Sequence, residues 1–417
     1  MSRPALLLYC QHSLGLGHLK RSWVLAEALL ADFKVVVLSG GEPPHGLCPP
    51  RGVDIVQLTP LSQDTGGHLH CLDGSMSVHE AQARRKAAIM RALHATRPEV
   101  VLVELFPFGR RKFAGELLPL IEEARRPPRA LVLSSVRDIL VNLNVNQQAR
   151  DDKARQIADE YFDGVLVHAD PQFAVFEESF RPTEPLRVPI HYTGFVVAPG
   201  ETVREPCFPP RVLVSAGGGR YGGPLFNAAL DAHVRLAGRP DVTMTIVAGP
   251  LCPSETLDGL HRAAAGLAGL TIERTVPDLA LEMARATLSV SQCGYNTALD
   301  IIKSGVAALV VPFSDDGENE QSNRASRLQG LGALRVLEAE RLDGATLASA
   351  IEATLSFRPQ GVSLDLTGAA TTARLIATLL RRSRTKASSR SATRRPDHST
   401  PLHAYTVRKS SLPPRTH

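Results

Sequence analysis

The segment that most constrains this chain is Thr287–Arg327, which predicts in order a strand, a tight polar turn, a helix, a strand, an acidic loop and a helix. Thr287–Ser291 and Val306–Pro312 are short apolar runs, and the second is continuous enough for a strand buried on both faces. Between them, Thr297–Ser304 has the apolar spacing of a helix. The segment therefore predicts part of an open parallel α/β sheet.

Two polar parts of this segment lie where such sheets bind ligands. Asn296 is the expected N-cap of the helix, and Gly305 is its expected end. The turn at Gly294 comes just before the helix, and the free amides of a helix N-terminus suit a phosphate. The polar segment Ser314–Gln321 follows the second strand, at the strand end where open parallel sheets bind ligands.

Three elements carry a family resemblance: the run Ser291–Thr297 (SQCGYNT), Asp300, and the run Glu320–Ala325 (EQSNRA). Together they resemble the donor-sugar half of the GT-B glycosyltransferases of family 28, which MurG typifies. They are most similar to a bacterial group of MurG-like predicted glycosyltransferases. The resemblance implies an α/β chain with the GT-B fold, in which two Rossmann-like domains face each other across a cleft.

Length and composition agree with a two-domain α/β protein. A chain of 417 residues exceeds the usual size of one core, and 43% hydrophobic with 21% charged residues is ordinary for a globular protein. Six scattered cysteines without CxxC spacing favour a reducing, cytoplasmic setting. The apolar run Leu6–Cys10 is too short for a signal peptide, and no run approaches the ~20 residues of a membrane span.

The net charge of +5 is unevenly distributed. Residues 381–417 contain ten Lys or Arg and one acid, a local charge of +9, so the preceding 380 residues carry about −4. The pI of 9.0 therefore does not indicate nucleic-acid binding by the folded part. The tail is rich in Ser, Thr, Arg and Pro, which predicts disorder, with weak peripheral attraction to anionic lipid at the inner membrane face as a secondary expectation.

A proline-rich segment divides the chain. Residues 199–210 (PGETVREPCFPP) hold four prolines and a glycine, which is typical of a linker. The preceding Tyr192–Val196 resembles the YTGF element at which the family leaves its first domain. We expect a Rossmann-like acceptor domain over 1–198, the linker over 199–210, a Rossmann-like nucleotide-sugar donor domain over 211–366, a C-terminal helix over 367–380 that packs back on the first domain, and a disordered basic tail over 381–417.

A glycine-punctuated segment after the first predicted strand contains Gly15, Gly17, His18 and Arg21 in the form GxGHxxR. A dinucleotide site is disfavoured, because Lys20 stands in place of the third glycine of GxGxxG and no acid ends the second strand. GxGHxxR resembles the N-terminal loop of the MurG-like transferases and of a nucleotide-sugar hydrolase from bacterial nonulosonic acid synthesis. In both, a histidine lies near the anomeric carbon.

His18 suits the task of a general base, since an unperturbed imidazole pKa of about 6.5 allows proton removal near neutrality. The alternative is that His18 only caps or packs the first helix. Glu104 ends a predicted strand and could orient an acceptor or His18, although relatives more often have Asp there; alternatively it pairs with Arg110 or Arg111. Arg137 and Asp138 resemble an SxRD element that lines the site, or they form a simple ion pair.

The second half begins with another strand, glycine loop and helix, and the loop contains Gly217, Gly218 and Gly219. Backbone without side chains can surround an anion at a helix start, but the loop lacks the GK[ST] of a P-loop. The resemblance implies that this loop faces the donor diphosphate and that Asp300 binds the ribose hydroxyls. It further assigns the donor to these residues: Gly294, Tyr295, Asn296 and Thr297 around the diphosphate, and Glu320 with Gln321 on the sugar hydroxyls.

The resemblance thus implies an inverting, metal-independent hexosyltransferase without a cofactor, which uses a nucleotide sugar, UDP-linked by expectation. The acceptor is open: lipid-linked, polysaccharide or small molecule. No DxD element ends a strand, which agrees with a reaction that needs no metal; Asp315 and Asp316 fit that element poorly. A nucleotide-sugar hydrolase of the same fold and a non-catalytic sugar-nucleotide-binding protein are the alternatives.

Overall fold

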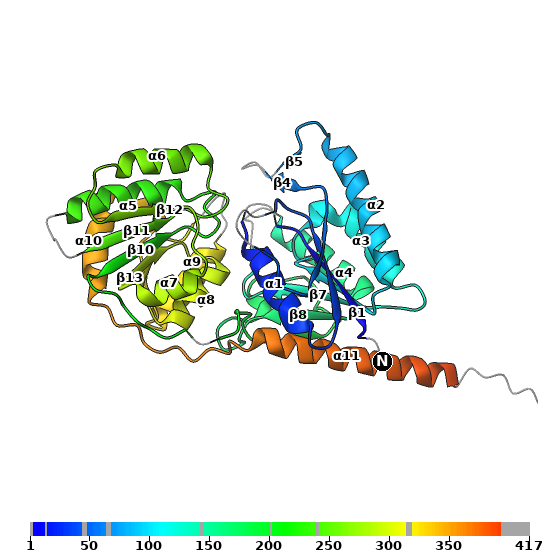
Figure 1. Ribbon diagram of the computed structural model, residues 1–417. Coiled ribbons are helices and arrows are strands. Elements are labelled where there is room, and N and C mark those ends of the chain that lie inside the picture. Colours follow the sequence, from blue (N-terminus) through cyan, green and yellow to red (C-terminus); the bar gives the residue numbers. More distant parts are fainter. Residues whose placement is uncertain are drawn as a thin grey trace, which may run out of the picture.

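The computed structural model describes residues 3–12, 15–43, 48–63, 68–141, 146–200, 202–237, 242–313 and 319–392. The chain forms two α/β lobes, each built around a parallel sheet, and a long C-terminal helix runs along the first lobe (Figure 1). Within the described residues, no helix has both the length and the apolar character needed to cross a membrane.

The sheet of the first lobe has seven parallel strands in the order β3-β2-β1-β6-β7-β8-β9. Its strands are β1 (Ala5–Cys10), β2 (Lys34–Ser39), β3 (Asp54–Gln57), β6 (Val100–Glu104), β7 (Leu131–Arg137), β8 (Gly164–His168) and β9 (Ile190–Tyr192). The helices between them are α1 (Gly17–Leu29), α2 (Val78–Thr96), α3 (Ala114–Ala124) and α4 (Gln147–Tyr161), with short 3₁₀ turns η1 (Arg111–Phe113) and η2 (Phe176–Glu178).

Both faces of this sheet are covered, which explains why its strands are continuous apolar runs. Along β1, Leu7 and Tyr9 belong to the apolar core that includes α2 and α3. The alternate residues Leu6 and Leu8 belong to the core that includes α1 and the C-terminal helix. All four are fully buried, because successive residues of a strand point to opposite faces.

The sheet of the second lobe has six parallel strands in the order β12-β11-β10-β13-β14-β15. Its strands are β10 (Arg211–Ser215), β11 (Thr243–Val247), β12 (Leu270–Glu273), β13 (Leu288–Ser291), β14 (Ala307–Val310) and β15 (Arg335–Val336). The helices are α5 (Gly223–Leu236), α6 (Ser254–Ala264), α7 (Leu279–Arg285), α8 (Tyr295–Ser304), α9 (Glu320–Gly330) and α10 (Gly344–Leu355), with the 3₁₀ turn η3 (Ala339–Arg341).

The two sheets share one topology, and this topology places the site. In each sheet the first strand pairs with the second on one side and with a later strand on the other: β1 with β2 and β6, and β10 with β11 and β13. From this first strand, the following strands are added on one side of the sheet and the later strands on the other side. A crevice therefore opens at the carboxyl ends of the strands where the strand order changes direction. The predicted motifs follow β1, β6, β10 and β13.

The C-terminal helix is longer than predicted. α11 spans Gly368–Ala392 instead of ending at Leu380, so the expectation of disorder is wrong for residues 381–392. Ala373, Ile376 and Leu380 are buried in the core that α1 shares, and Arg384 Nε donates to Glu99 Oε2 over 2.9 Å. The contact with Glu99 accompanies the extension of the helix beyond Leu380. The residues of this extension are too polar for a helix to be predicted from their sequence. Residues 393–417 lie outside the described part.

The segment Leu61–Gly74 contains a short stretch of regular structure. β4 (Leu61–Gln63) and β5 (Leu69–Cys71) pair as a short antiparallel ribbon, whereas residues 64–67 are not described. Leu61 and Ser62 are buried, and the Leu61 amide donates to Gly40 O. Strands of three residues are too short to show a recognisable alternation in sequence.

Candidate active site

A cleft of about 810 Å³ separates the two lobes and is lined by both. From the first lobe it receives the loops after β1, β6 and β7; from the second it receives the loops after β10 and β13 and the start of α9. These are the carboxyl ends of parallel strands in both sheets, where the topology predicts ligand binding. Among the described residues, no group of three or more His, Cys, Asp or Glu is placed to hold a metal ion.

His18 and Glu104 meet at the first-lobe wall of this cleft. His18 Nδ1 lies 2.6 Å from Glu104 Oε1, and the same oxygen accepts a hydrogen bond from Arg21 Nη2. Glu104 and Arg21 are buried, whereas the His18 side chain keeps 15% of its surface exposed to the cleft. Glu104 therefore pairs with Arg21 and His18, and the alternative pairing with Arg110 or Arg111 does not occur. His18 is also not the N-cap of α1, which is Leu16.

The charges of this pair determine the tautomer of His18. Burial lowers the pKa of His18 to about 3, although Glu104 opposes the shift. Burial works to raise the pKa of Glu104, but His18 and Arg21 outweigh it and hold that pKa at about 2. At neutral pH a carboxylate can only accept, so the neutral imidazole carries its proton on Nδ1. Nε2 is left as a proton acceptor.

The glycine loop of the second lobe approaches the glycine loop of the first. Gly219 has φ +91°, and a Cβ there would lie 1.9 Å from Ala248 O, so only glycine fits. A Cβ on Gly218 would lie 3.6 Å from Gly15 Cα, which places the two loops on opposite sides of one narrow crevice. Backbone amides from both lobes therefore line the same part of the cleft.

The start of α8 is open toward the cleft. Gly294 is its N-cap, in place of the expected Asn296, and no side chain caps the helix there, so its first amides are available to an anion. Gly305 ends the helix with φ +63°, as predicted. One turn into the helix, the half-buried Asp300 lines the cleft. Burial raises the pKa of its carboxyl to about 6, while Lys20 of the first lobe partly opposes the shift.

Tyr295 and Asn296 join the lobes with their side chains. Tyr295 Oη donates to His168 O over 2.9 Å and accepts from the Val196 amide at 3.0 Å, both in the first lobe. Asn296 Nδ2 donates to Gly17 O over 3.0 Å. The Tyr295 hydroxyl is therefore used between the lobes, and the residue is 4% exposed. The expectation that Tyr295 lies at a diphosphate stays a prediction for its backbone at the start of α8.

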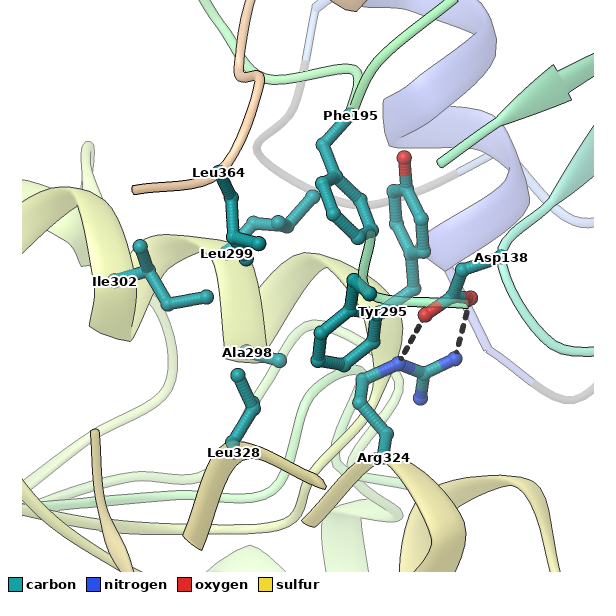
Figure 2. A pocket seen from close by; sticks show the side chains of 10 residues that line it. Asp138, Phe195, Tyr295, Ala298, Leu299, Ile302, Arg324, Leu328 and Leu364 are labelled. Carbon is teal, nitrogen blue, oxygen red and sulfur yellow. Dashed lines mark hydrogen bonds and ion pairs between the residues drawn. The ribbon is translucent and has the colours of Figure 1, made fainter. Parts of the chain in front are cut away.

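Arg137, Asp138 and Glu320 form a buried ionic cluster with Arg324, which we call the interlobe cluster. Arg324 donates from Nε and Nη2 to both Asp138 oxygens, as Figure 2 shows, and from Nη2 to Glu320. Glu320 also pairs with Arg137 across 2.6 Å. The SxRD residues thus pair with the second lobe and not with each other, since each guanidinium meets a carboxylate of the opposite lobe.

The same cluster engages Glu320. Its two carboxylate oxygens pair with Arg137 and Arg324, while the residue also lines the cleft, so its contact with a sugar stays a prediction. Gln321 lines the cleft, but its Oε1 accepts from the amides of Cys293 and Phe313, which leaves only the amide nitrogen for a ligand. Both residues belong to the first turn of α9 and not to a loop. Arg324 was missed as a functional residue, although it lies inside the EQSNRA run that carried the resemblance.

Comparison with known proteins agrees with this geometry in the second lobe. The profile of the glycosyltransferase family 28 C-terminal domain matches residues 260–377. This part of the chain is similar to the family 28 domain. The match covers α8, Asp300 and the start of α9, so the resemblance to MurG-like family 28 proteins predicted from these residues is confirmed.

Curated relatives of the family 28 domain match part of the chain. A UDP-N-acetylglucosamine--N-acetylmuramyl-(pentapeptide) pyrophosphoryl-undecaprenol N-acetylglucosamine transferase from Xylella fastidiosa is 30% identical over 161 residues, 38% of this chain and 43% of the relative. The transferase of the same name from Syntrophotalea carbinolica is 34% identical over 125 residues, 27% of this chain and 35% of the relative. The matches span less than half the length of these relatives.

Solved structures resemble the whole two-lobed chain. MurG of Acinetobacter baumannii covers 90% of this chain and all of its own, with a TM-score of 0.53 and 16% identity. The calicheamicin glycosyltransferase covers 92% of this chain and 94% of its own, with a TM-score of 0.52 and 18% identity. The likeness shows that the protein has the predicted α/β GT-B fold.

Proposed function

We propose that this protein is an inverting glycosyltransferase that moves a hexosyl group from a UDP-linked sugar to an acceptor hydroxyl. The observation that carries the proposal is the His18–Glu104 pair, which leaves the unprotonated Nε2 of the imidazole at the cleft opposite the open start of α8. A base on one lobe and an anion site on the other are the two parts that glycosyl transfer requires.

The residues of the cleft account for the proton that is removed and for the charges that develop in the reaction. His18 Nε2 removes the proton of the acceptor hydroxyl, whose oxygen then bonds to the anomeric carbon as the bond from that carbon to the diphosphate oxygen breaks on the opposite face. Glu104 stabilises the imidazolium that forms, because its carboxylate remains ionised. The amides of α8 and of the Gly217–Gly219 loop stabilise the charge on the leaving nucleoside diphosphate without a need for a metal.

The donor is proposed to lie along α8. Asp300 accepts hydrogen bonds from the two ribose hydroxyls, since its carboxylate lines the cleft one turn beyond the anion site. Gln321 is left to bond the sugar through its amide nitrogen. The curated relatives are named for transfer from UDP-N-acetylglucosamine, which supports a UDP-linked donor. The family 28 match over these residues supports the same assignment.

The test is to incubate the full chain with UDP-, dTDP- and GDP-sugars and to follow nucleotide release by phosphorus NMR, with and without EDTA. We expect release of UDP that persists in EDTA and is lost in His18→Ala. Free sugar as the sole product would indicate the hydrolase instead. Release of UMP would indicate cleavage between the phosphates, and failure to bind any of these nucleotides would refute the donor site around Asp300.

A further inference from the structure

The first-lobe wall of the cleft is strongly basic. The ionisable residues that line it include seven Lys or Arg and one acid, Asp151. Two of these cations are neutralised: Arg21 by Glu104 and Arg137 by Glu320. Lys20 lies near Asp300 of the opposite lobe. Four further cations occur together, on η1, on the turn before it and on α4 (Arg110, Arg111, Lys112 and Arg150).

Three of these residues, Arg110, Arg111 and Arg150, form what we call the arginine wall. Arg111 Nη1 donates to Arg150 O over 3.4 Å, so the first turn of α4 lies against η1. No carboxylate among the described residues pairs with a guanidinium of the arginine wall. Burial lowers the pKa of Arg111, and the neighbouring charge of Arg150 lowers it further. Like charges held this close favour the binding of an anion.

Asp151, the acid near the arginine wall, forms no ion pair with its guanidinium groups. Asp151 Oδ1 accepts from Gln147 Nε2 over 2.7 Å, and Oδ2 accepts from the Arg181 amide over 2.9 Å. Both of its oxygens therefore already hold hydrogen bonds inside the lobe, although the residue also lines the cleft. Asp151 therefore acts on Arg111 only through its charge, and no ion pair among the described residues competes with a ligand anion for these guanidinium groups.

Arg110 gives a second, independent indication. Its Nε is buried and has no hydrogen-bond partner among the described residues. Its backbone has φ +56°, a left-handed conformation that is uncommon for a residue with a side chain and that concentrates at functional sites. The residue lies on the loop that leads from Glu104 to α3, so it lies on the acceptor side of the proposed base.

We infer that the acceptor carries an anionic oxygen group, a phosphate or a carboxylate, which the arginine wall binds while His18 takes the proton of the attacking hydroxyl. This inference rests on the proposed function, which places the acceptor on the first lobe. Guanidinium groups suit both ligand types, because their N–H donors match the geometry of phosphate and carboxylate oxygens. Leu140, Val141 and Phe108 line the cleft beside these cations, so an apolar part of the same acceptor has a surface to contact.

Binding of small anions tests this inference without knowledge of the acceptor. Inorganic pyrophosphate, phosphate and succinate are titrated calorimetrically into the full chain that is already saturated with UDP, which occupies the donor's anion site. We expect one of these anions to bind, with an affinity that falls at least tenfold in Arg111→Gln and in Arg150→Gln. Arg150→Lys should recover part of the loss, because it keeps the charge. The stronger anion identifies phosphate or carboxylate as the group.

The matched control is Lys153→Gln, which removes one exposed positive charge from the same helix outside the cleft. It should bind the anion like the unmodified protein, and the UDP affinity of every variant should be unchanged, which also shows that each variant is folded. Anion binding that is absent, or equal in all variants, would overturn the inference. So would a loss of UDP affinity in the arginine variants, since these residues would then serve the donor. If UDP itself does not bind, the proposed function fails first.

Discussion

Arg324 of α9 binds Asp138 of the first lobe with two parallel hydrogen bonds, Nε to Oδ2 at 2.8 Å and Nη2 to Oδ1 at 2.7 Å. Both side chains are almost completely buried, and 186 residues separate them in sequence. Phe195 and Tyr295 lie beside the pair at the junction of the lobes, as Figure 2 shows. The two lobes therefore meet through a charged contact that water does not screen, and this contact adjoins the cleft.

Asp138→Asn should lower the free energy of unfolding by about 3 to 5 kcal/mol, because removal of one partner leaves the other charge buried and uncompensated. Urea unfolding measures the change. Asp258→Asn, an exposed acid on α6, is the control and should change the stability by less than about 0.5 kcal/mol. Equal stability of the two variants would show that the lobes do not depend on the interlobe cluster.

Tyr295→Phe should separate a role in joining the lobes from a role in binding the donor. The change removes one hydroxyl that bonds His168 O and the Val196 amide, so a loss of about 1 to 3 kcal/mol of stability is expected. The KM for the donor should stay within about twofold, because the hydroxyl faces the first lobe. A large rise in KM with unchanged stability would instead return Tyr295 to the donor site.

His18→Ala should lower kcat by about 10² to 10⁴-fold, the usual contribution of a general base, while the affinity for UDP stays the same. Rates with a saturating donor and UDP titration measure the two quantities. His261→Ala, an exposed histidine on α6, is the control and should be fully active. Full activity of His18→Ala would mean that another group takes the acceptor proton.

Donor use should weaken in mild acid. Burial raises the pKa of Asp300 from its ordinary value to about 6, so the carboxyl is ionised at pH 7 and protonated below pH 6. Only the ionised form accepts hydrogen bonds from both ribose hydroxyls through both oxygens, so kcat/KM for the donor should fall about tenfold per pH unit below 6. His18, with its pKa near 3, does not titrate in this range.

Asp300→Asn is the matching variant for this pH dependence. It should show a lower kcat/KM at pH 7.5 and no further fall between pH 6 and 5. If the fall persists in the variant, another group controls donor binding, and the assignment of Asp300 to the ribose loses its support.

Gly219 and Gly223, four positions apart in sequence, allow a paired test of the second glycine loop. Gly219→Ala should abolish UDP binding, because its φ of +91° and the 1.9 Å approach to Ala248 O force the loop to move. Gly223→Ala is the control, since a Cβ there meets nothing within 4 Å. Equal UDP affinity in both variants would mean that the loop does not hold the diphosphate.

Most strands could be predicted from the sequence because burial on both faces makes them continuous apolar runs. β14 lies within the apolar run Val306–Pro312, and β1 extends the run Leu6–Cys10 by one residue. The helix α4 was not predicted, because its buried positions are only Asp151, Ala154 and Ala158 and it has no apolar stripe. The hairpin of β4 and β5 escaped notice because each strand has three residues.

The sequence by itself determined the α/β class, the positions of both glycine loops and the presence of His18 and Asp300, because local spacing and composition encode these features. Only the tertiary structure decided which of these side chains face a ligand. His18 and Glu104 meet because β1 pairs with β6, a contact between residues 86 positions apart. Glu320 and Tyr295 instead bind the opposite lobe, because their partners lie far away along the chain and come close only when the two sheets face each other.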